Sequence, residues 1–264
     1  MPPQKPRLTN QRRVAIAEKV LDQGMARVID LAKHFSVSEV TIRNDLEILE
    51  RDGHLLRDHG GATAIQSSRI VKTLLRVDER ATHYLERKQR IGQTAAGLVG
   101  PGDTIILDAG TTTIQMTPRL AEISSLTVVT NALNIALKIG SVSSIRQELI
   151  LLGGTFHRES SSNLGPLTVH NLGEIIVHKL FLGTQAFDLQ HGLTDSTMEI
   201  AQVKRAMIRA AQQVILLTDS SKWDHSGFSK VAPLEEVDTL ITDSAFPVPA
   251  RAALEQLGVK VIIA

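Results

Sequence analysis

Small polar residues follow a short aliphatic run, TIIL, near the middle of the chain. They are a carboxylate, a glycine and three hydroxyls: Asp108, Gly110, Thr111, Thr112 and Thr113. If a helix begins at the threonines, its free N–H groups, the close backbone approach at the glycine and the hydroxyl donors suit a bound phosphate. An ordinary N-capped turn explains the same residues equally well. The segment is neither a Walker A loop nor a G-x-G-x-x-G dinucleotide fingerprint.

Other aliphatic runs end in similar residues, which are Thr130, Asn131, Gly153, Gly154, Gly183, Asp219 and Lys222. A phosphate needs a countercharge, which Lys222 could supply, and a sugar hydroxyl needs an acceptor, which Asp219 could supply. The same two residues could instead form a structural ion pair. Lys88 and Lys204 are further cations, although we expect both to be solvated helix residues. Together the run ends predict an effector site for a phosphorylated sugar.

A second group of polar residues lies near the N-terminus, in the segment SEVTIRNDLEILERDG. Its apolar residues recur at i, i+4 and i+7, which predicts an amphipathic helix that ends at Gly53. These apolar residues are Ile42, Leu46 and Leu49. Ser38 is the natural N-cap, and a rival capping box of Ser36 with Glu39 would begin the helix two residues earlier.

Polar side chains must project from the opposite side of this helix, near its N-terminus. In a helix-turn-helix the corresponding residues of the second motif helix contact base edges in the major groove, where Arg suits guanine and Asn suits adenine. The alternative is a surface helix with solvated polar residues. The predicted DNA-binding residues of the helix are Ser38, Thr41, Arg43 and Asn44.

The next segment, HLLRDHGGATAI, contains two short apolar runs around the turn-forming sequence DHGG. This pattern predicts a β-hairpin that would serve as the wing of a winged helix-turn-helix. Arg57 and His59 would lie at its tip. There they would contact the sugar-phosphate backbone, which fixes register without reading sequence.

Two further elements are expected before the DNA-reading helix. The segment QRRVAIAEKVLDQ predicts a helix within residues 10–23 that ends at Gly24. Val28 and Ile29 are expected to be extended, and Asp30 is expected to cap LAKHF as a second helix. A brief turn at 36–38 then leads into the third.

Beyond residue 102 the chain alternates helical stretches with short aliphatic runs: TIILD, LTVVT, ELILL, KLFLG, VILLTD, TLITD and VKVIIA. The runs lack polar alternation, which predicts a mostly parallel sheet with helices on both faces. Ligands of such sheets bind at the carboxyl ends of the strands, where the polar residues described above stand. Residues 66–90 carry seven Lys and Arg. We expect them to form a solvated connecting helix, with contact to the DNA backbone as the alternative.

The N-terminal residues are similar to a known family. VIDLAKHFSVSEVTIRNDLEILERDGHLLRDHGGA resembles the DeoR-type helix-turn-helix, in which LA, VS, TIR, DL, LE and HGGA recur at this spacing. The resemblance implies a DNA-binding regulator of transcription. Asn44 departs from the pattern, because many members have a second Arg there, and this departure bears on which operator sequence is bound.

The resemblance continues through the rest of the chain and covers residues 10–264. It is carried by LDAGTTT, VVTNALNIA, LLGG, LFLGTQAFDLQHGLTD and VKRAMIRAAQQVILLTDSSK. It implies a C-terminal α/β domain related to ribose-5-phosphate isomerase and glucosamine-6-phosphate deaminase, with phosphorylated sugars as inducers. FDLQHGLTD, TIRND and DSSKW most resemble members that control catabolism of amino sugars, notably N-acetylgalactosamine.

Composition is compatible with this interpretation. Residues 1–90 carry 17 Lys and Arg against 12 Asp and Glu, whereas residues 91–264 carry 12 against 16. This is a weak nucleic-acid signal that a chance imbalance would also give. The chain has no cysteine and only 3% aromatic residues, so thiolate zinc sites and stacking platforms for single strands are not expected. No signal peptide or membrane span is recognisable, and we expect a cytoplasmic protein.

The sequence therefore predicts a winged helix-turn-helix at 1–65, a basic linker helix at 66–90 and a sugar-phosphate sensing α/β domain at 91–264. We expect a repressor of a sugar or amino-sugar catabolic operon that a phosphorylated sugar relieves. The expected partners are double-stranded operator DNA and further copies of the chain, as a dimer or tetramer, with no cofactor, metal or membrane.

The alternative is an isomerase-like or deaminase-like enzyme fused to a DNA-binding domain, with Asp195 or Glu199 as general base. We expect no catalysis, because a fused DNA reader needs only occupancy of the site by a ligand. Zinc deaminase chemistry is not expected, since His157-Arg158-Glu159 lacks the P-C-x-x-C partner.

Overall fold

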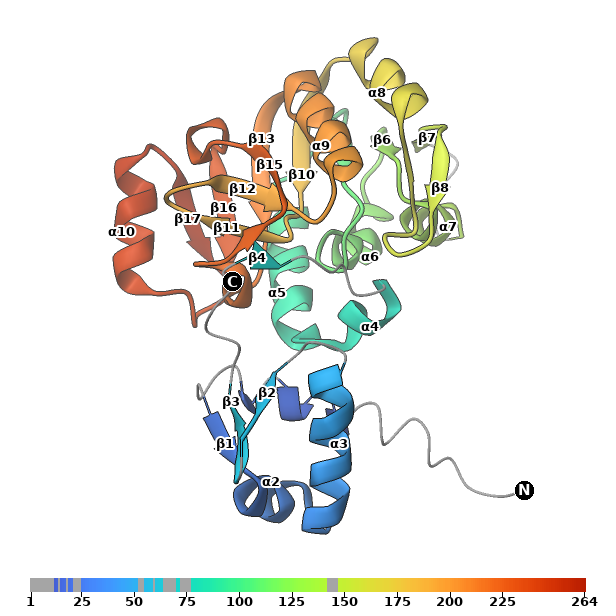
Figure 1. The fold of residues 1–264 in the computed structure, drawn as a ribbon. Helices are drawn as coiled ribbons and strands as arrows, with labels where there is room; N and C mark the ends of the chain where they lie inside the picture. Colours follow the sequence, from blue (N-terminus) through green and yellow to red (C-terminus); the bar gives the residue numbers. More distant parts are fainter. Residues whose placement is uncertain are drawn as a thin grey trace, which may run out of the picture. The chain divides into compact units, whose positions relative to one another are not determined.

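The computed structural model describes residues 12–13, 15–17, 19–20, 25–51, 55–58, 60–63, 70–71, 77–141 and 147–264. The chain divides into two compact units, Met1–Ser68 and Arg69–Ala264. Figure 1 shows the helices and strands of each unit. No helix among the described residues is long and apolar enough to cross a membrane.

The N-terminal unit consists of helices and a small antiparallel sheet. Its elements are β1 (Met25–Arg27), α2 (Val28–Phe35), α3 (Glu39–Arg51), β2 (Leu56–Arg57) and β3 (Gly61–Thr63), preceded by helical residues within 12–20. The strand order is β1-β3-β2. Ile42, Leu46 and Leu49 of α3 are buried in the core of this unit, as their spacing predicts.

The prediction for the start of α2 was wrong by about one turn. The extended residues are Met25–Arg27 rather than Val28 and Ile29, because β1 pairs with β3 through Ala26 and Ala62. The helix then begins at Val28, and Asp30 lies in its first turn instead of capping it.

The prediction that Ser38 caps α3 is confirmed. Its Oγ accepts a hydrogen bond from the backbone N–H of Thr41 at 3.1 Å. The rival capping box is wrong, because Ser36 is the C-cap of α2, with a left-handed φ of 54°, and Glu39 bonds to Arg43. The expected helix end at Gly53 lies outside the described residues.

The C-terminal unit is built on one seven-stranded sheet, and all seven predicted strands are confirmed. They are β5 (Thr104–Leu107), β6 (Thr127–Thr130), β7 (Glu148–Leu151), β10 (Val177–Leu182), β13 (Ala211–Leu217), β16 (Thr239–Thr242) and β17 (Lys260–Ile263). The order is β17-β16-β13-β10-β5-β6-β7 with every neighbouring pair parallel. Every strand therefore ends at the same edge, which we call the carboxyl edge.

Helices cover both faces of this sheet, so successive strand residues enter two different cores (Figure 1). Ile105 and Leu107 pack with α5 (Leu85–Ala96), α6 (Thr117–Leu120) and α7 (Leu133–Gly140). Ile106 packs with α8 (Pro166–Gly173), α9 (Met198–Ala210) and α10 (Val248–Gln256). Burial of both faces is why the runs carry no polar alternation.

Several short strands were not predicted, because pieces of two to four residues rich in turn formers carry little periodicity. They form the hairpin β8 (Thr155–His157) and β9 (Ser162–Leu164), and the sheet β11 (Ala186–Asp188), β12 (Gly192–Asp195) and β15 (Ser229–Ala232). A further pair joins β4 (Ile70–Val71) to β14 (Ser226–Gly227).

The expectation of a solvated connecting helix in residues 66–90 was wrong for the described part. Two helices, α4 (Val77–Thr82) and α5, are separated by Tyr84, whose φ is 49°. Lys88 is only 4% exposed, and the next turns of α5 enter the sheet core through Ile91 and Ala95. These helices are thus part of the C-terminal unit.

Candidate functional site

The predicted DNA-reading residues of α3 lie on the side of the helix that faces away from its core. Ser38, Arg43 and Asn44 are exposed, and Thr41 is half-buried. The Arg43 side chain is 58% exposed and pairs with Glu39, one turn earlier, at 3.0 Å. An exposed i,i+4 pair is weak, so a base or phosphate can replace it at little cost. Val40, which sequence reasoning did not single out, is also 65% exposed beside these residues.

A buried carboxylate anchors α3 on its core side. Asp45 is 2% exposed, and its two oxygens accept from Arg12 Nε at 2.6 Å and Arg13 Nε at 2.9 Å. Sequence reasoning missed this contact. Its signal was a carboxylate between Ile42 and Leu49 on the apolar face, where a charged residue stays buried only when it is paired.

The predicted wing is the β2–β3 hairpin. Arg57 is exposed, its backbone N–H donates to Glu50 at 2.9 Å, and its guanidinium lies 3.9 Å from the same carboxylate. The turn is closed by Asp58, whose carboxylate accepts from the Gly60 N–H. His59 lies outside the described residues.

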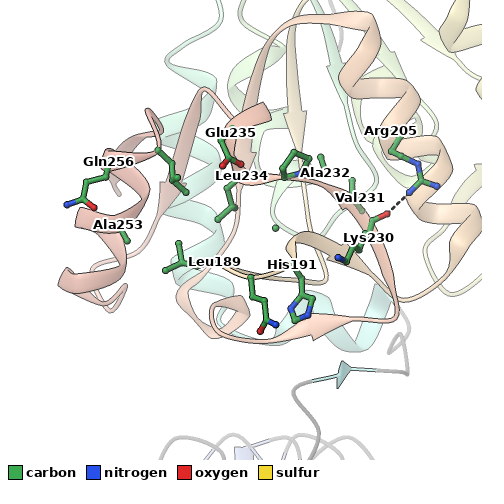
Figure 2. Close-up of a pocket in the computed structure, with 14 residues that line it drawn as sticks. Leu189, His191, Arg205, Lys230, Val231, Ala232, Leu234, Glu235, Ala253 and Gln256 are labelled. Carbon is green, nitrogen blue, oxygen red and sulfur yellow. Dashed lines mark hydrogen bonds between the residues drawn. The ribbon is translucent and has the colours of Figure 1, made fainter.

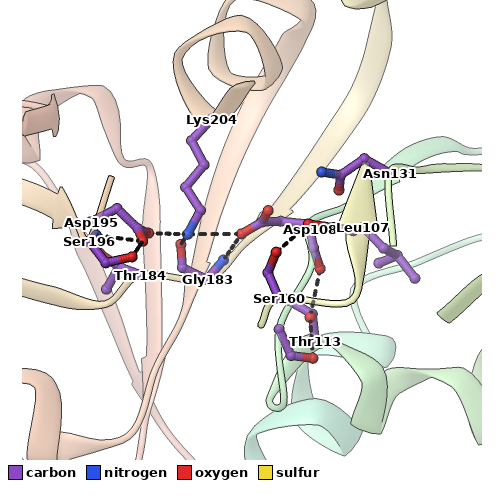
Figure 3. A network of polar contacts seen from close by, with 12 residues as sticks. Leu107, Asp108, Thr113, Asn131, Ser160, Gly183, Thr184, Asp195, Ser196 and Lys204 are labelled. Atoms are coloured by element: carbon purple, nitrogen blue, oxygen red, sulfur yellow. Dashed lines mark hydrogen bonds and ion pairs between the residues drawn. The ribbon is translucent and has the colours of Figure 1, made fainter. Parts of the chain in front are cut away.

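A buried charged network stands at the carboxyl edge of the sheet in the C-terminal unit (Figure 3). Lys204 of α9 places its ammonium 2.6 Å from Asp195, at the end of β12, and 3.3 Å from Asp108, at the end of β5. It also donates to the Gly183 carbonyl at 2.9 Å, while the Gly183 N–H donates to Asp108 at 3.0 Å. Asp108 thus meets charged residues that lie more than 80 positions later in the sequence, on the neighbouring elements β12 and α9.

Burial and mutual attraction set the protonation of this network. Burial by itself lowers the pKa of Lys204, but the charges of Asp108 and Asp195 outweigh it and hold that pKa above its ordinary value. Burial raises the pKa of Asp108, and the Lys204 charge offsets only part of this effect. Lys204 is closer to Asp195, so Asp108 is the less compensated carboxylate and the better placed to accept from a ligand hydroxyl.

The structure changes the argument for a phosphate at residues 110–113. A helix does follow the segment, but its first turn, Thr113–Met116, is 3-10 and only Thr117–Leu120 is α-helical, so the dipole that would favour an anion is weak. The Thr113 hydroxyl donates to the carbonyls of Asp108 and Gly110 and holds the loop closed. Thr111 and Thr112 are buried beside it.

The predicted residues that follow β6 and β7 differ in what they bond. The Thr130 hydroxyl donates to the Leu107 carbonyl at 2.7 Å, which ties β6 to β5. Asn131 donates to the Asn163 carbonyl, yet its buried Oδ1 has no hydrogen-bond partner among the described residues. Gly153 and Gly154 have a packing role.

That packing role is clearest at Gly154. A Cβ added there would lie 2.2 Å from Thr168 Oγ1 and 2.6 Å from the Leu164 carbonyl, at a φ of 153°. The Thr168 hydroxyl donates to the Gly153 carbonyl at 2.7 Å. Close approach of α8 therefore explains this glycine pair without a ligand.

Asp219 and Lys222 stand at the end of β13, and they do not form the ion pair that was the alternative to a ligand site. Asp219 is 2% exposed and accepts from the Ser221 N–H, and thus caps a short 3-10 turn. Lys222 makes no salt bridge with a residue that the structure describes. Burial lowers the pKa of Lys222, and the charge of Asp219 opposes this.

Arg80 of α4 was missed, although it lies within electrostatic reach of this edge. Burial lowers its pKa, while the charges of Asp195 and Asp108 raise it. Its charge also lowers the pKa of Lys222, and Asp195 raises the pKa of both cations. Nothing in the local sequence distinguishes this Arg from the basic residues around it.

The expectation that Lys88 and Lys204 are solvated was wrong. Lys204 is 6% exposed, and Lys88 donates to the Arg80 carbonyl at 2.6 Å. The sequence held a signal for both, because each occupies an apolar-face position of its helix. Lys204 lies at i+4 from Ile200, and Lys88 lies three residues before Ile91.

A hollow of about 720 Å³ lies elsewhere in the C-terminal unit (Figure 2). It is lined by the β11–β12 turn, β15 and α10, and Arg205 donates to the Lys230 carbonyl at its rim. None of the predicted effector residues lines it. The described residues contain no group of three or more His, Cys, Asp or Glu that could hold a metal ion.

Two domain families of the DeoR type match the chain. The DeoR-like helix-turn-helix domain matches residues 12–68, and the DeoR C-terminal sensor domain matches residues 83–244. The chain belongs to the DeoR family. As a DeoR-family regulator, it binds DNA through its N-terminal unit and carries a sensor domain in its C-terminal unit, as the sequence predicts.

Full-length relatives are named as regulators. The chain is 39% identical to the uncharacterized HTH-type transcriptional regulator YulB of Bacillus subtilis, covering 96% of both chains. It is 32% identical to the putative aga operon transcriptional repressor of Escherichia coli O157:H7, covering 97% of this chain and 94% of that one. It is also 32% identical to the transcriptional repressor GlcR of Bacillus subtilis, over 96% and 95%.

Solved structures share the sensor fold only in part. The ribose 5-phosphate isomerase of Methanocaldococcus jannaschii is 16% identical over 52% of this chain and 53% of that one, with a TM-score of 0.37. A TM-score this low does not equate the two folds. The DeoR family match therefore carries the identification.

Proposed function

We propose that this DeoR-family regulator is a repressor that leaves its operator when a phosphorylated sugar binds at the carboxyl edge of the C-terminal sheet. The observation that carries the proposal is the buried network of Asp108, Asp195 and Lys204. Nearby, Lys222 forms no salt bridge with any residue that the structure describes. Buried charge of this kind costs stability and is typical of functional sites.

The edge offers complementary groups for the two ends of such a ligand. Lys222 supplies positive charge for a phosphate, helped by Thr111 and Thr112. Asp108 and Asn131 supply acceptors for sugar hydroxyls, and Asn131 Oδ1 has no bond to lose in the described structure. This division places the acidic and amide groups toward the carbon skeleton and the cation toward the phosphate.

Relatives named as repressors support the sign of regulation, since the aga operon and GlcR relatives both carry that word. Amino-sugar specificity, including N-acetylgalactosamine, stays a prediction of the resemblance in FDLQHGLTD and DSSKW. For the operator, we propose that Arg43 and Asn44 of α3 contact base edges while Arg57 contacts the backbone.

We also propose a two-fold symmetric assembly, as a dimer or tetramer. One recognition helix contacts too few base pairs to select one site in a genome, and paired helices multiply that selectivity. Light scattering on the full chain tests this. A strictly monomeric protein that binds a single half-site tightly contradicts it.

A thermal-shift screen of hexose, pentose and amino-sugar phosphates tests the effector proposal. A ligand of the native state raises the melting temperature according to RT ln(1 + [L]/Kd). We expect at least one sugar phosphate to do so while inorganic phosphate at the same concentration does much less. If no sugar phosphate does, the effector proposal fails.

The same mixtures distinguish the enzyme alternative. Asp195, one candidate base, is buried and held by Lys204 at 2.6 Å, whereas Glu199 is exposed. We expect the sugar phosphates to be recovered unchanged after long incubation. Multiple turnovers would instead establish an isomerase-like or deaminase-like activity.

A further inference from the structure

Unsatisfied oxygen atoms mark the carboxyl edge of the sheet. Within the part of the chain that the structure describes, Asn131 Oδ1, Gln185 Oε1 and Thr242 Oγ1 are buried there without a hydrogen-bond partner. They stand at or just beyond the ends of β6, β10 and β16. Native proteins leave few buried polar atoms unpaired, because each one forfeits its bond to water, so such atoms call for an explanation.

Gln185 and Thr242 are neither predicted effector residues nor members of the charged network, and Gln185 is the one whose connection bonds to that network. It is 7% exposed and lies in the three-residue connection from β10 to β11. Gly183, two residues earlier, is fixed at both its backbone groups, since its N–H donates to Asp108 and its carbonyl accepts from Lys204. The connection that carries Gln185 is therefore bonded to the charged network through Gly183.

The two residues before Gln185 contact the charged network and the β11–β12 sheet. The Thr184 hydroxyl donates to the carbonyls of Ala186 and Thr194, so its side chain is directed toward the β11–β12 sheet. A Cβ added to Gly183 would lie 3.4 Å from Asp108 Oδ2, so that side of the backbone faces the carboxylate. Gln185 lies at the bend between this connection and β11, and its side chain is buried next to these bonded residues in the sequence.

Asp108 and Gln185 both present acceptors at this part of the carboxyl edge, because the connection that carries Gln185 bonds to Asp108 through Gly183. A phosphate brings only acceptor oxygens when it is fully ionised, so it does not suit this end of the site. A sugar hydroxyl or amino group brings the donors that these atoms lack. The phosphate is left to the Lys222 end.

We propose that Gln185 Oε1 accepts a hydrogen bond from a hydroxyl or amino group on the carbon skeleton of the effector, and that this bond helps select which sugar phosphate is recognised. The inference rests on the proposed function, because it assigns a residue to the same ligand. It adds the chemical requirement that the effector carry a donor opposite the β10–β11 connection.

The test compares Gln185→Met with the wild-type full chain. The substitution keeps the length of the side chain and removes its acceptor. Affinities for glucosamine 6-phosphate, glucose 6-phosphate, fructose 6-phosphate, ribose 5-phosphate and inorganic phosphate are measured by calorimetry, together with melting temperatures of the free proteins. Asn171→Leu is the matched control, since Asn171 Oδ1 is an unpartnered buried acceptor on α8.

We expect the sugar phosphate that binds the wild type most tightly to bind Gln185→Met about tenfold more weakly, as one lost hydrogen bond implies. Inorganic phosphate should bind both proteins equally, and Asn171→Leu should bind the sugar like the wild type. The melting temperature of free Gln185→Met should stay the same or rise, because no partner within the protein is left behind.

Unchanged sugar affinity in Gln185→Met overturns the inference and leaves the proposed function standing. A fall in melting temperature with an equal loss of inorganic phosphate binding also overturns it, since that result indicates a structural role. If none of the sugar phosphates binds the wild type, the proposed function fails, and this inference fails with it.

Discussion

The DNA-reading helix and the sensor site present their functional groups in opposite ways. On α3, Arg43 and Asn44 are exposed and lie on one helix, so their role follows from local spacing. At the carboxyl edge, Asp108, Asp195 and Lys204 are each at most 6% exposed, and Asp108 is more than 80 residues away from the other two in the sequence. The first arrangement suits a large partner that binds from outside, whereas the second ties its charged groups to the stability of their unit.

Removing the cation of the buried network should have the largest effect. Lys204→Met leaves Asp108 and Asp195 buried without their countercharge, which should lower the free energy of unfolding by about 3 to 5 kcal/mol. Urea denaturation followed by the fluorescence of Trp223, the one tryptophan of the chain, reports on the sensor unit.

Lys179→Met is the matched control for this loss. Lys179 lies 2.5 Å from Asp103, but both side chains are partly exposed, at 22% and 17%. Its removal should cost less than about 1 kcal/mol. Equal losses in the two variants would show that burial does not distinguish the network from an ordinary ion pair.

Lys222→Ala should break sensing while leaving the free protein intact. Because Lys222 makes no salt bridge with a described residue, its loss should hardly change the melting temperature. Operator affinity without ligand should be normal, and the coupling to sugar phosphate, typically about 1 to 3 kcal/mol, should disappear. A destabilised variant that still responds to the sugar would contradict the assignment. Lys230→Ala, an exposed cation at the rim of the hollow, provides the control.

Arg43→Ala should weaken operator binding by about 1 to 3 kcal/mol and relax the preference at one base pair. The reason is that its exposed guanidinium is placed to contact a base edge. Gel-shift titrations on operator and random DNA measure the effect. An equal loss on both DNAs means that Arg43 contacts only phosphates.

Arg57→Ala should give the smallest and least specific change. As a phosphate contact, its loss should weaken operator and random DNA alike and lower the slope of log K against log salt by about one unit. Titrations at several salt concentrations measure that slope. If the slope does not change, Arg57 makes no phosphate contact, and the wing does not bind DNA through this residue.

The contrast between local patterns and contacts assembled by the fold also determines how much could be predicted from the sequence. All seven sheet strands and the apolar face of α3 follow from hydrophobic periodicity, because each is a local pattern that burial enforces. The convergence of strand ends follows from the parallel topology. The wing hairpin was predicted from its turn-forming DHGG, whereas the short strands of the C-terminal unit were not, because pieces of two to four residues carry little periodicity.

The candidate site was predicted less completely than the fold. Asp108 follows a strand and was identified, but Lys204 was expected to be solvated because only its position on the apolar face of α9 hinted otherwise. Arg80 and Gln185 gave no distinctive local signal, and Lys88, like Lys204, was marked only by its position on the apolar face of its helix. Their importance depends on which segments fold against β5 and β10, and single-sequence patterns do not contain that information.

Operator affinity of the full chain, measured with and without the sugar phosphate that most raises its melting temperature, tests the central claim most directly. The account predicts a fall of about 5-fold to 150-fold in operator affinity when the sugar is bound, and an equal fall in sugar affinity when operator is bound, because the two are reciprocally linked. Identical operator affinity at saturating sugar, in a protein that binds both ligands, would contradict the account.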